Sequence, residues 1–202
     1  RGLAAGTRLW SEDLAEHGYD LSFSGKWHVS ATESPQNRGW KLTGDDGLFI
    51  DKSKEVWNKY AEGKASEAHP RQEGEIIRPG WDEYTHYGSM DNPFNDDGVV
   101  DEAIRVIKER AGSDQPWCQY VGTLGPHDPY CPPQRFIDMY DIDDIKLPES
   151  FYDTLEDKPN FYRRTRDIFA QLSEDEHREA ILRYLAFCSY EDYLFGKLLD
   201  AL

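Results

Sequence analysis

Two short segments of this chain combine a glycine with basic side chains that could bind an anion. They are Gly25-Lys26-Trp27-His28 and Gly125-Pro126-His127-Asp128-Pro129-Tyr130. Lysine supplies a compact positive charge, and histidine supplies an imidazole that can donate or accept a proton. Together Lys26, His28 and His127 could hold a small tetrahedral anion. The functional question is therefore whether the two motifs meet.

The first motif follows a predicted helix and a predicted strand. Thr7 can cap a helix that ends at Gly18. Residues 19–24 then alternate apolar and polar side chains, which is the two-residue period of a β-strand. Because alternate side chains of an extended segment point the same way, Lys26 and His28 are predicted to share one side.

The second motif has the same layout. Apolar residues recur at helical spacing over residues 100–107, and Gly112 ends this predicted helix. Residues 117–124 are interpreted as a continuous, fully buried strand. Helix, strand and polar cluster, found twice, indicate an α/β sheet, whose ligands bind beyond the carboxyl ends of the strands. The prolines of the second motif are predicted to hold it extended.

The remaining segments are predicted to be scaffold. Residues 30–95 lack sustained periodicity and are interpreted as an irregular insertion, and residues 141–172 as loops. Ser173 and Glu176 form a capping box in front of a long helix. The apolar stripe of that helix is predicted to comprise Ile181, Tyr184, Leu185, Cys188, Phe195, Leu199 and Leu202.

Composition excludes several classes of protein. The net charge of −16 over 202 residues argues against nucleic acid as a partner, since a negative field repels phosphate backbones. No apolar run approaches the roughly 18 residues of a membrane span. The three cysteines lack the spacing of a zinc site. The chain starts at Arg1 and stops at Leu202 inside a helical pattern, so we expect an internal segment of a longer protein.

Each motif alone has an ordinary alternative explanation: a solvated lysine, a histidine bonded to backbone, or a proline-rich loop. In this order, however, the two motifs resemble the sulfatase family of the alkaline-phosphatase-like superfamily. Three further segments resemble that family: Leu14-Ala15-Glu16-His17-Gly18-Tyr19, Arg38-Gly39-Trp40 and the helix from Tyr184 to Leu202. The resemblance implies a mixed β-sheet flanked by helices, with residues 1–202 as an internal part of one catalytic domain.

The resemblance also implies an activity, the hydrolysis of small sulfate esters of sugars or aryl groups. Lys26 and His28 would contact the nucleophile and the sulfate oxygens, and His127 would bind sulfate and help the leaving oxygen depart. In the family the nucleophile is a formylglycine made from the cysteine of a C-x-P-S-R motif. A calcium or magnesium ion held by aspartates polarises the sulfate.

This sequence departs from the whole-enzyme pattern. No C-x-P-S-R and no Asp-Asp-x-Gly precede Lys26, and Asp45-Asp46-Gly47 follows the first motif. Cys131 fits C-x-P-x-R, but it lies after His127, whereas the family's nucleophile comes before the lysine. We therefore expect the nucleophile and the metal ligands to lie outside this chain, and the isolated chain to be inactive.

Two alternatives remain open: a phosphonate monoester hydrolase or phosphodiesterase of the same superfamily, and a non-catalytic anion- or glycan-binding homologue. A ring of the substrate could stack on aromatic residues of the insertion, namely Trp57, Tyr60, Trp81, Tyr84 and Tyr87. Because members of the family are often exported, we expect the protein in the periplasm, the extracellular space or the lysosome.

Overall fold

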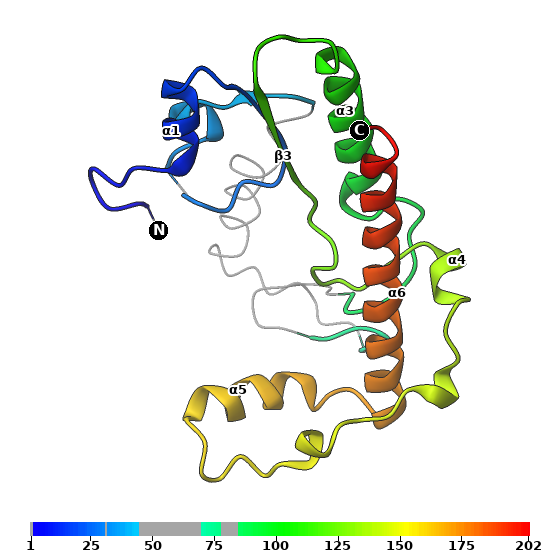
Figure 1. Cartoon of the computed structure of the whole chain (residues 1–202). Helices are drawn as coiled ribbons and strands as arrows, with labels where there is room; N and C mark the ends of the chain where they lie inside the picture. The colour runs from blue at the N-terminus through cyan, green and yellow to red at the C-terminus, as the bar shows by residue number, and fades with distance from the viewer. Residues whose placement is uncertain (1, 31, 45–69, 78–84) are drawn as a thin grey trace. The chain divides into compact units, whose positions relative to one another are not determined.

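The structure is a computed structural model that describes residues 2–30, 32–44, 70–77 and 85–202 (Figure 1). The chain divides into two compact units. The first unit comprises Arg1–Asn58, Phe94–Leu124 and Glu191–Leu202, and the second comprises Lys59–Pro93 and Gly125–Tyr190. Asp45, Asp46 and Gly47 lie outside the described residues, as do four of the five aromatic residues named for the insertion, Trp57, Tyr60, Trp81 and Tyr84.

The first unit contains a three-stranded sheet in the order β2-β1-β3, in which both strand pairs are parallel. The strands are β1 (Asp20–Gly25), β2 (Lys41–Leu42) and β3 (Trp117–Gly122). The predicted α/β partial domain with a β-sheet flanked by helices is confirmed, and among the described residues the sheet is parallel rather than mixed. β2 was not predicted, because it lies within the segment interpreted as an irregular insertion.

Strand β1 is buried on both faces, although its alternating sequence is typical of a strand with one polar face. Leu21 and Phe23 belong to the apolar core, and Ser22 and Ser24 are also buried. Ser24 Oγ lies 2.6 Å from Thr43 Oγ1 and accepts a hydrogen bond of 2.9 Å from the Gln119 amide. A central parallel strand is covered on both faces, so buried polar side chains are usually paired inside the protein, as Ser24 is. The Ser22 hydroxyl is also buried and has no hydrogen-bond partner among the described residues.

Strand β3 is more exposed than predicted, whereas β1 is more buried than its sequence suggests. β3 is predicted to be fully buried, but no residue of Trp117–Gly122 is fully buried and Tyr120 is 43% exposed. β3 pairs with β1 along one edge and with no other strand among the described residues. The strand also ends at Gly122 rather than at the predicted residue 124.

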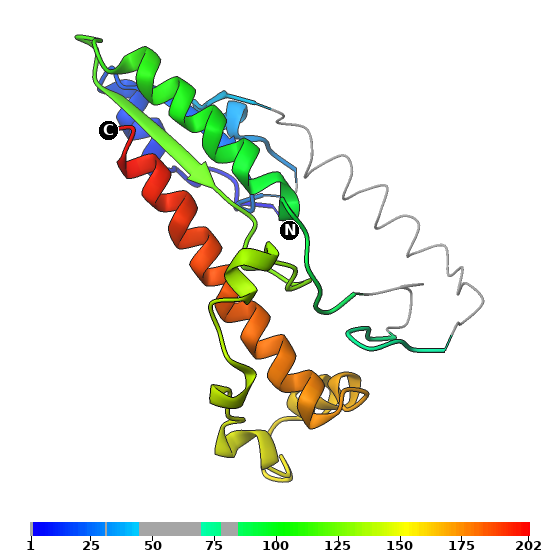
Figure 2. The same cartoon turned by 90° about the vertical axis from the view of Figure 1, so that its right-hand side faces the viewer.

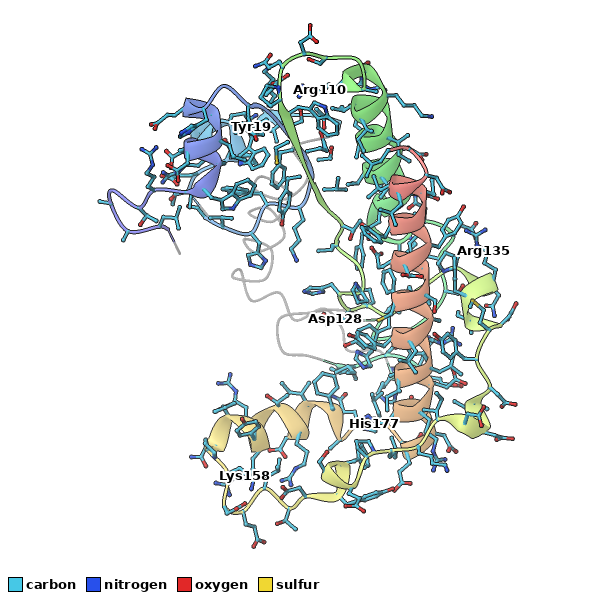
Figure 3. All side chains as sticks on the ribbon, in the orientation of Figure 1. Tyr19, Arg110, Asp128, Arg135, Lys158 and His177 are labelled. Atoms are coloured by element: carbon cyan, nitrogen blue, oxygen red, sulfur yellow. The ribbon has the colours of Figure 1, made fainter. Side chains whose placement is uncertain are left out.

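Two helices of the first unit accompany this sheet. Helix α1 (Trp10–Glu16) begins after Leu9 instead of Thr7, because the Glu12 carboxylate accepts the Leu9 N–H at 2.8 Å. Gly18 has a φ of +80° just beyond the helix, as the predicted helix end requires. Helix α3 (Asp96–Arg110) begins four residues before the predicted apolar pattern and ends two residues before Gly112, the predicted stop. The Arg110 guanidinium lies 2.8 Å from the Asp20 carboxylate and joins α3 to the start of β1 (Figure 3).

Helix α6 (Glu174–Leu199) is continuous (Figure 2) and begins at the predicted capping box. The Glu176 N–H donates to Ser173 Oγ at 3.2 Å, and the Ser173 N–H donates to the Glu176 carboxylate at 2.8 Å. The predicted apolar stripe is wrong, since Tyr184, Phe195, Leu199 and Leu202 are exposed. The buried apolar residues of the helix are instead Ala180, Leu182, Ala186, Phe187, Tyr190 and Leu194. The helix carries two apolar stripes, and packing partners rather than periodicity select the buried one.

The segment 141–172 is only partly the loop that its prolines suggest. It contains two 3-10 turns, Ile142–Asp144 and Glu149–Tyr152, and the ten-residue helix α5 (Asn160–Phe169). Pro159 directly precedes α5, where a missing N–H costs no helical hydrogen bond. A short helix, α4 (Gln134–Ile137), follows the second motif. Within the part of the chain that the structure describes, no helix has both the length and the apolarity needed to cross a membrane.

Candidate functional site

The first motif begins where β1 ends beside β3. Gly25 has a φ of +90°, and a Cβ at this position would lie 2.1 Å from the Gly122 carbonyl oxygen. Only glycine fits here, since any side chain would meet both a strained backbone and the neighbouring strand. The Lys26 N–H donates to the same oxygen at 2.7 Å. Lys26 is therefore held at the carboxyl end of two adjacent parallel strands, where the sequence predicts a ligand site.

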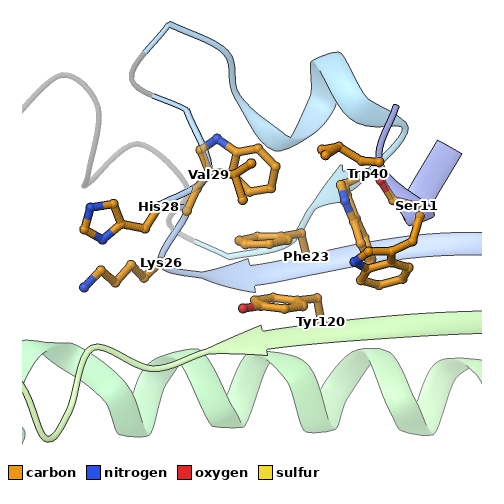
Figure 4. A pocket seen from close by; sticks show the side chains of 10 residues that line it. Ser11, Phe23, Lys26, His28, Val29, Trp40 and Tyr120 are labelled. Atoms are coloured by element: carbon orange, nitrogen blue, oxygen red, sulfur yellow. The ribbon is translucent and has the colours of Figure 1, made fainter. Parts of the chain in front are cut away.

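Trp27 anchors the motif. Its side chain is buried, its Nε1–H donates to the Glu33 carbonyl at 2.8 Å, and its ring meets Phe23 edge to face with centroids 5.5 Å apart. Lys26 and His28 point together to the same side, away from the Phe23 ring (Figure 4). This is the arrangement that their two-residue spacing predicts. His28 is exposed and makes no hydrogen bond with any residue in the described ranges.

His127 belongs to the second unit, where Asp128 orients its ring. Nδ1 of His127 lies 2.6 Å from the Asp128 carbonyl oxygen and 2.8 Å from the Asp128 carboxylate. Both of these oxygens accept hydrogen bonds, so Nδ1 carries a proton. Proton exchange with a ligand is therefore left to Nε2. The side chain is 55% exposed, so a ligand can reach it.

The backbone around His127 is not extended, which corrects the prediction made from its prolines. Residues 125–126 form a turn and 127–129 a bend, and the Gly125-Pro126 and Asp128-Pro129 peptide bonds are cis. The Cys131 N–H donates to the Pro129 carbonyl at 3.0 Å and closes a tight turn.

A segment of the predicted insertion fixes the position of this turn. The Tyr130 N–H donates to the His86 carbonyl at 2.8 Å, and the Gly88 N–H donates to the Tyr130 carbonyl at 3.0 Å. The Arg183 guanidinium of α6 in turn donates to the Gly88 carbonyl at 2.8 Å. The insertion therefore contributes structure around the second motif.

Cys131 lies directly after the second motif and is not a nucleophile in this environment. Its side chain is 3% exposed, and burial raises the pKa of the thiol above its ordinary value. A reactive cysteine needs an accessible thiolate. These observations support the sequence argument that assigned Cys131 to the proline-rich segment rather than to the chemistry.

The structure brings Lys26 and His28 together within the first unit and places His127 in the second. The joint site of these three residues therefore stays a prediction. Each motif by itself follows the end of a strand, as the sequence indicates.

A pocket of about 200 Å³ lies beside the first motif, entirely within the first unit (Figure 4). Lys26 and His28 stand at one end of it and Trp40 at the other. Phe23 and Tyr120 form a stacked pair with centroids 4.6 Å apart. Sequence reasoning missed this pocket, since it depends on the β1–β3 register that pairs Phe23 with Tyr120.

Two carboxyl groups also lie near the carboxyl end of β3, and sequence reasoning missed them as well. Asp96 is buried, and one of its oxygens accepts the Leu124 N–H at 2.8 Å. Glu191 lies beside Asp96 and Thr123, and burial raises its pKa to about 7, with the charge of Asp96 adding to the effect. Oε1 of Glu191 is buried with no hydrogen-bond partner among the described residues.

Replacing Glu191 by glutamine is expected to stabilise the protein at pH 8 and to have little effect at pH 4.5. Between about pH 4.5 and pH 7 the carboxyl of the folded protein binds more protons than that of the unfolded chain. The folded protein is therefore most stable below this window, and it loses stability as the pH rises through 7 and the buried carboxyl becomes charged. Glutamine carries no charge and keeps an N–H donor for Asp96. With a discount for partial exposure, the gain at pH 8 is about 2 kcal/mol, or roughly 4–8 °C in Tm.

Thermal unfolding followed by circular dichroism at pH 8 and pH 4.5 measures this difference. Asp192→Asn is the matched control, because it removes the neighbouring, exposed carboxylate of the same helix. A change in Tm that is equal at the two pH values, or equal in the two variants, would contradict the prediction.

Comparison with known proteins identifies the family. The model of the sulfatase family matches residues 11–202, so the chain belongs to the sulfatase family. A protein described as a sulfatase from Formosa agariphila is 27% identical over 201 residues, which cover 95% of this chain and 37% of that relative. The chain thus spans well under half the length of this relative. The predicted family and fold class are confirmed, and membership points to a hydrolase.

Sulfatases typically use a metal ion and a formylglycine. Across residues 2–30, 32–44, 70–77 and 85–202, no three His, Cys, Asp or Glu side chains converge as metal ligands would. Asp96 and Glu191 provide only two carboxyl groups. The described residues therefore do not fit a metal ion, and the buried Cys131 does not fit the formylglycine position.

Proposed function

We propose that this chain supplies the sulfate-binding lysine and histidines of a sulfuric ester hydrolase. The observation that carries the proposal is the position of Lys26 and His28. They extend together from the carboxyl end of β1, beside β3, on a backbone that Gly25 and Trp27 fix. His127 is the third proposed residue, and its ring is oriented by Asp128.

Lys26 and His28 would bind the sulfate oxygens. An ammonium group held in place reduces the repulsion between these oxygens and an approaching nucleophile, without reorganising during the reaction. The buried Trp27 between the two residues fixes their backbone, so little backbone entropy is lost when sulfate binds. The nucleophile and the metal ligands are proposed to lie outside this chain.

His127 would supply a proton to the leaving oxygen. When the S–O bond to the alcohol breaks, its electron pair stays on the departing oxygen, and a proton from Nε2–H of the imidazolium neutralises it. The Asp128 carboxylate, 2.8 Å from Nδ1, stabilises the positive ring and holds the tautomer that presents Nε2.

A substrate panel tests the proposal on the full-length protein that contains this chain. Rates are measured with an aryl sulfate, an aryl phosphate, a phosphodiester and a phosphonate monoester that share one leaving group. We expect kcat/KM to be highest for the sulfate. Preference for the phosphonate or the diester would favour the alternative hydrolases, and tight sulfate binding without turnover of any ester would favour a non-catalytic binding protein. Export from the cytoplasm is likewise proposed, because members of the family are often exported.

A further inference from the structure

Two acidic side chains, Asp96 and Glu191, hold the segment that directly follows β3. The Leu124 N–H donates to the carboxyl of Asp96, the first residue of α3, at 2.8 Å. The Thr123 hydroxyl donates to the carboxyl of Glu191 in α6, and this carboxyl is also hydrogen-bonded to Asp96. The two residues after β3 are therefore attached to two helices, through carboxyl groups that contact each other. We call Asp96 and Glu191 the acid pair.

The acid pair stays bonded only while it holds a proton. Two carboxylates in contact repel each other, whereas a carboxylic acid donates a hydrogen bond to a neighbouring carboxylate. Asp96 is the better place for the negative charge, since it lies in the first turn of α3 and accepts the Leu124 N–H. Oε1 of Glu191 is buried with no hydrogen-bond partner among the described residues, which disfavours a charge there. The shared proton therefore belongs on Glu191.

The charge of Glu191 has no cation to offset it. Within the described part of the chain, the one charged group that acts on Glu191 is Asp96. Lys197 of the same helix is engaged elsewhere, because its ammonium lies 2.7 Å from Asp97 and 2.7 Å from Asp101. Loss of the shared proton would thus place two negative charges side by side.

The segment that the acid pair holds also holds Lys26. The Lys26 N–H donates to the Gly122 carbonyl at 2.7 Å, and this carbonyl belongs to the peptide bond that joins Gly122 to Thr123. Because a peptide unit moves as one plane, a displacement of Thr123 shifts the oxygen to which Lys26 is bonded. Every contact from Glu191 to Lys26 lies within the first unit. The acid pair is therefore coupled to the first motif through a continuous set of contacts.

We propose that Asp96 and Glu191 are positioning residues for Lys26, and that the proton they share keeps this end of β3 in place. When the proton leaves, the carboxyl groups separate, Thr123 and Leu124 loosen, and Lys26 loses its fixed position. The part that Lys26 plays in turnover rests on the proposed function. The fixing of the strand end rests on the contacts alone.

Hydrogen exchange of the full-length protein, followed by mass spectrometry, tests the positioning without any chemistry. Peptides that contain the Leu124 N–H and the Lys26 N–H are compared at pH 5.5 and pH 8. Burial raises the pKa of Glu191 to about 7, so the wild type keeps the shared proton at the lower pH and loses it at the higher. Comparing variants at the same pH cancels the intrinsic pH dependence of exchange.

Two substitutions separate the shared proton from packing. Glu191→Gln keeps a neutral N–H donor for Asp96 at both pH values, and Glu191→Leu removes the hydrogen bonds. We expect both peptides of Glu191→Gln to exchange within twofold of the wild type at pH 5.5 and about tenfold more slowly than the wild type at pH 8. Glu191→Leu should exchange about tenfold faster than Glu191→Gln at both. Asp192→Asn, which removes the neighbouring exposed carboxylate, should match the wild type throughout.

The pH profile of turnover carries the test to the proposed site. Other groups of the site also titrate, so the measured quantity is the kcat/KM of Glu191→Gln for an aryl sulfate divided by that of the wild type, which cancels their effect. We expect this ratio to be near one at pH 5.5 and to rise about tenfold by pH 8.5.

Equal exchange of the wild type and Glu191→Gln at pH 8, or equal exchange of the glutamine and leucine variants, would overturn the role of the shared proton. A response of the Leu124 peptide without one of the Lys26 peptide would overturn the link to Lys26. Both results would leave the proposed function intact. If both peptides respond as expected while the full-length protein hydrolyses no sulfate ester, the positioning of Lys26 stands and the proposed function falls.

Discussion

Replacing Lys26 by methionine is expected to lower kcat/KM for an aryl sulfate about 10²- to 10³-fold in the full-length protein. Methionine keeps most of the length of the side chain and removes only the charge. A fixed donor that contacts the reacting group typically contributes an effect of this size, about 2.7–4 kcal/mol. The Lys26 N–H bond to Gly122 belongs to the backbone and survives the substitution, so the strand ends should stay in place.

Steady-state kinetics on the wild-type and variant proteins measure this loss. Lys108→Met is the matched control, because Lys108 is an exposed lysine of α3 in the same unit. Its removal changes the net charge by the same amount without touching the motif. If Lys26→Met retained activity within about threefold of Lys108→Met, the proposed role of Lys26 would be wrong and the motif would be structural.

The parts of the candidate site that the sequence predicts are those with local causes. Gly25 ends a strand because no other residue tolerates its φ beside Gly122, and the alternation of an extended chain puts Lys26 and His28 on one side. The capping box at Ser173 and Glu176 is equally local, since its two hydrogen bonds join residues three apart. Such features depend on a few neighbours in the chain and can be inferred from them.

The parts that the sequence does not predict depend on partners distant in the chain. Tyr120 belongs to a strand that looks fully buried, yet its exposure is set by how many strands pair with β3. The acid pair forms only because Asp96 and Glu191, 95 residues apart, lie together, and no local pattern marks either residue. The predicted apolar stripe of α6 is wrong for the same reason: packing partners distant in the chain bury Leu194 and leave the adjacent Phe195 exposed.

Replacing Glu176 by glutamine is expected to produce the largest loss of stability in the second unit, about 2–3 kcal/mol at pH 7. The Glu176 carboxylate is 7% exposed and accepts two bonds from Arg71, at 2.6 and 3.0 Å. It also accepts the N–H groups of Gly74 and Ser173, at 3.3 and 2.8 Å. Glutamine would turn an N–H₂ group toward these donors and leave the partly buried Arg71 without its counter-charge, which is costly.

The pH dependence distinguishes this ion pair from ordinary packing. The Arg71 guanidinium and the two backbone donors lower the pKa of Glu176 to about 2, below its ordinary 4.5. The stabilisation is therefore complete above about pH 4.5 and is lost as the pH falls toward 2. Thermal unfolding should show Glu176→Gln below wild type by roughly 4–12 °C at pH 7, and by clearly less at pH 3. Glu174→Gln removes an exposed carboxylate two residues earlier in α6 and should cost about 0.5 kcal/mol through the helix dipole. A difference that persists unchanged at pH 3 would show that Glu176 acts through packing rather than through its charge.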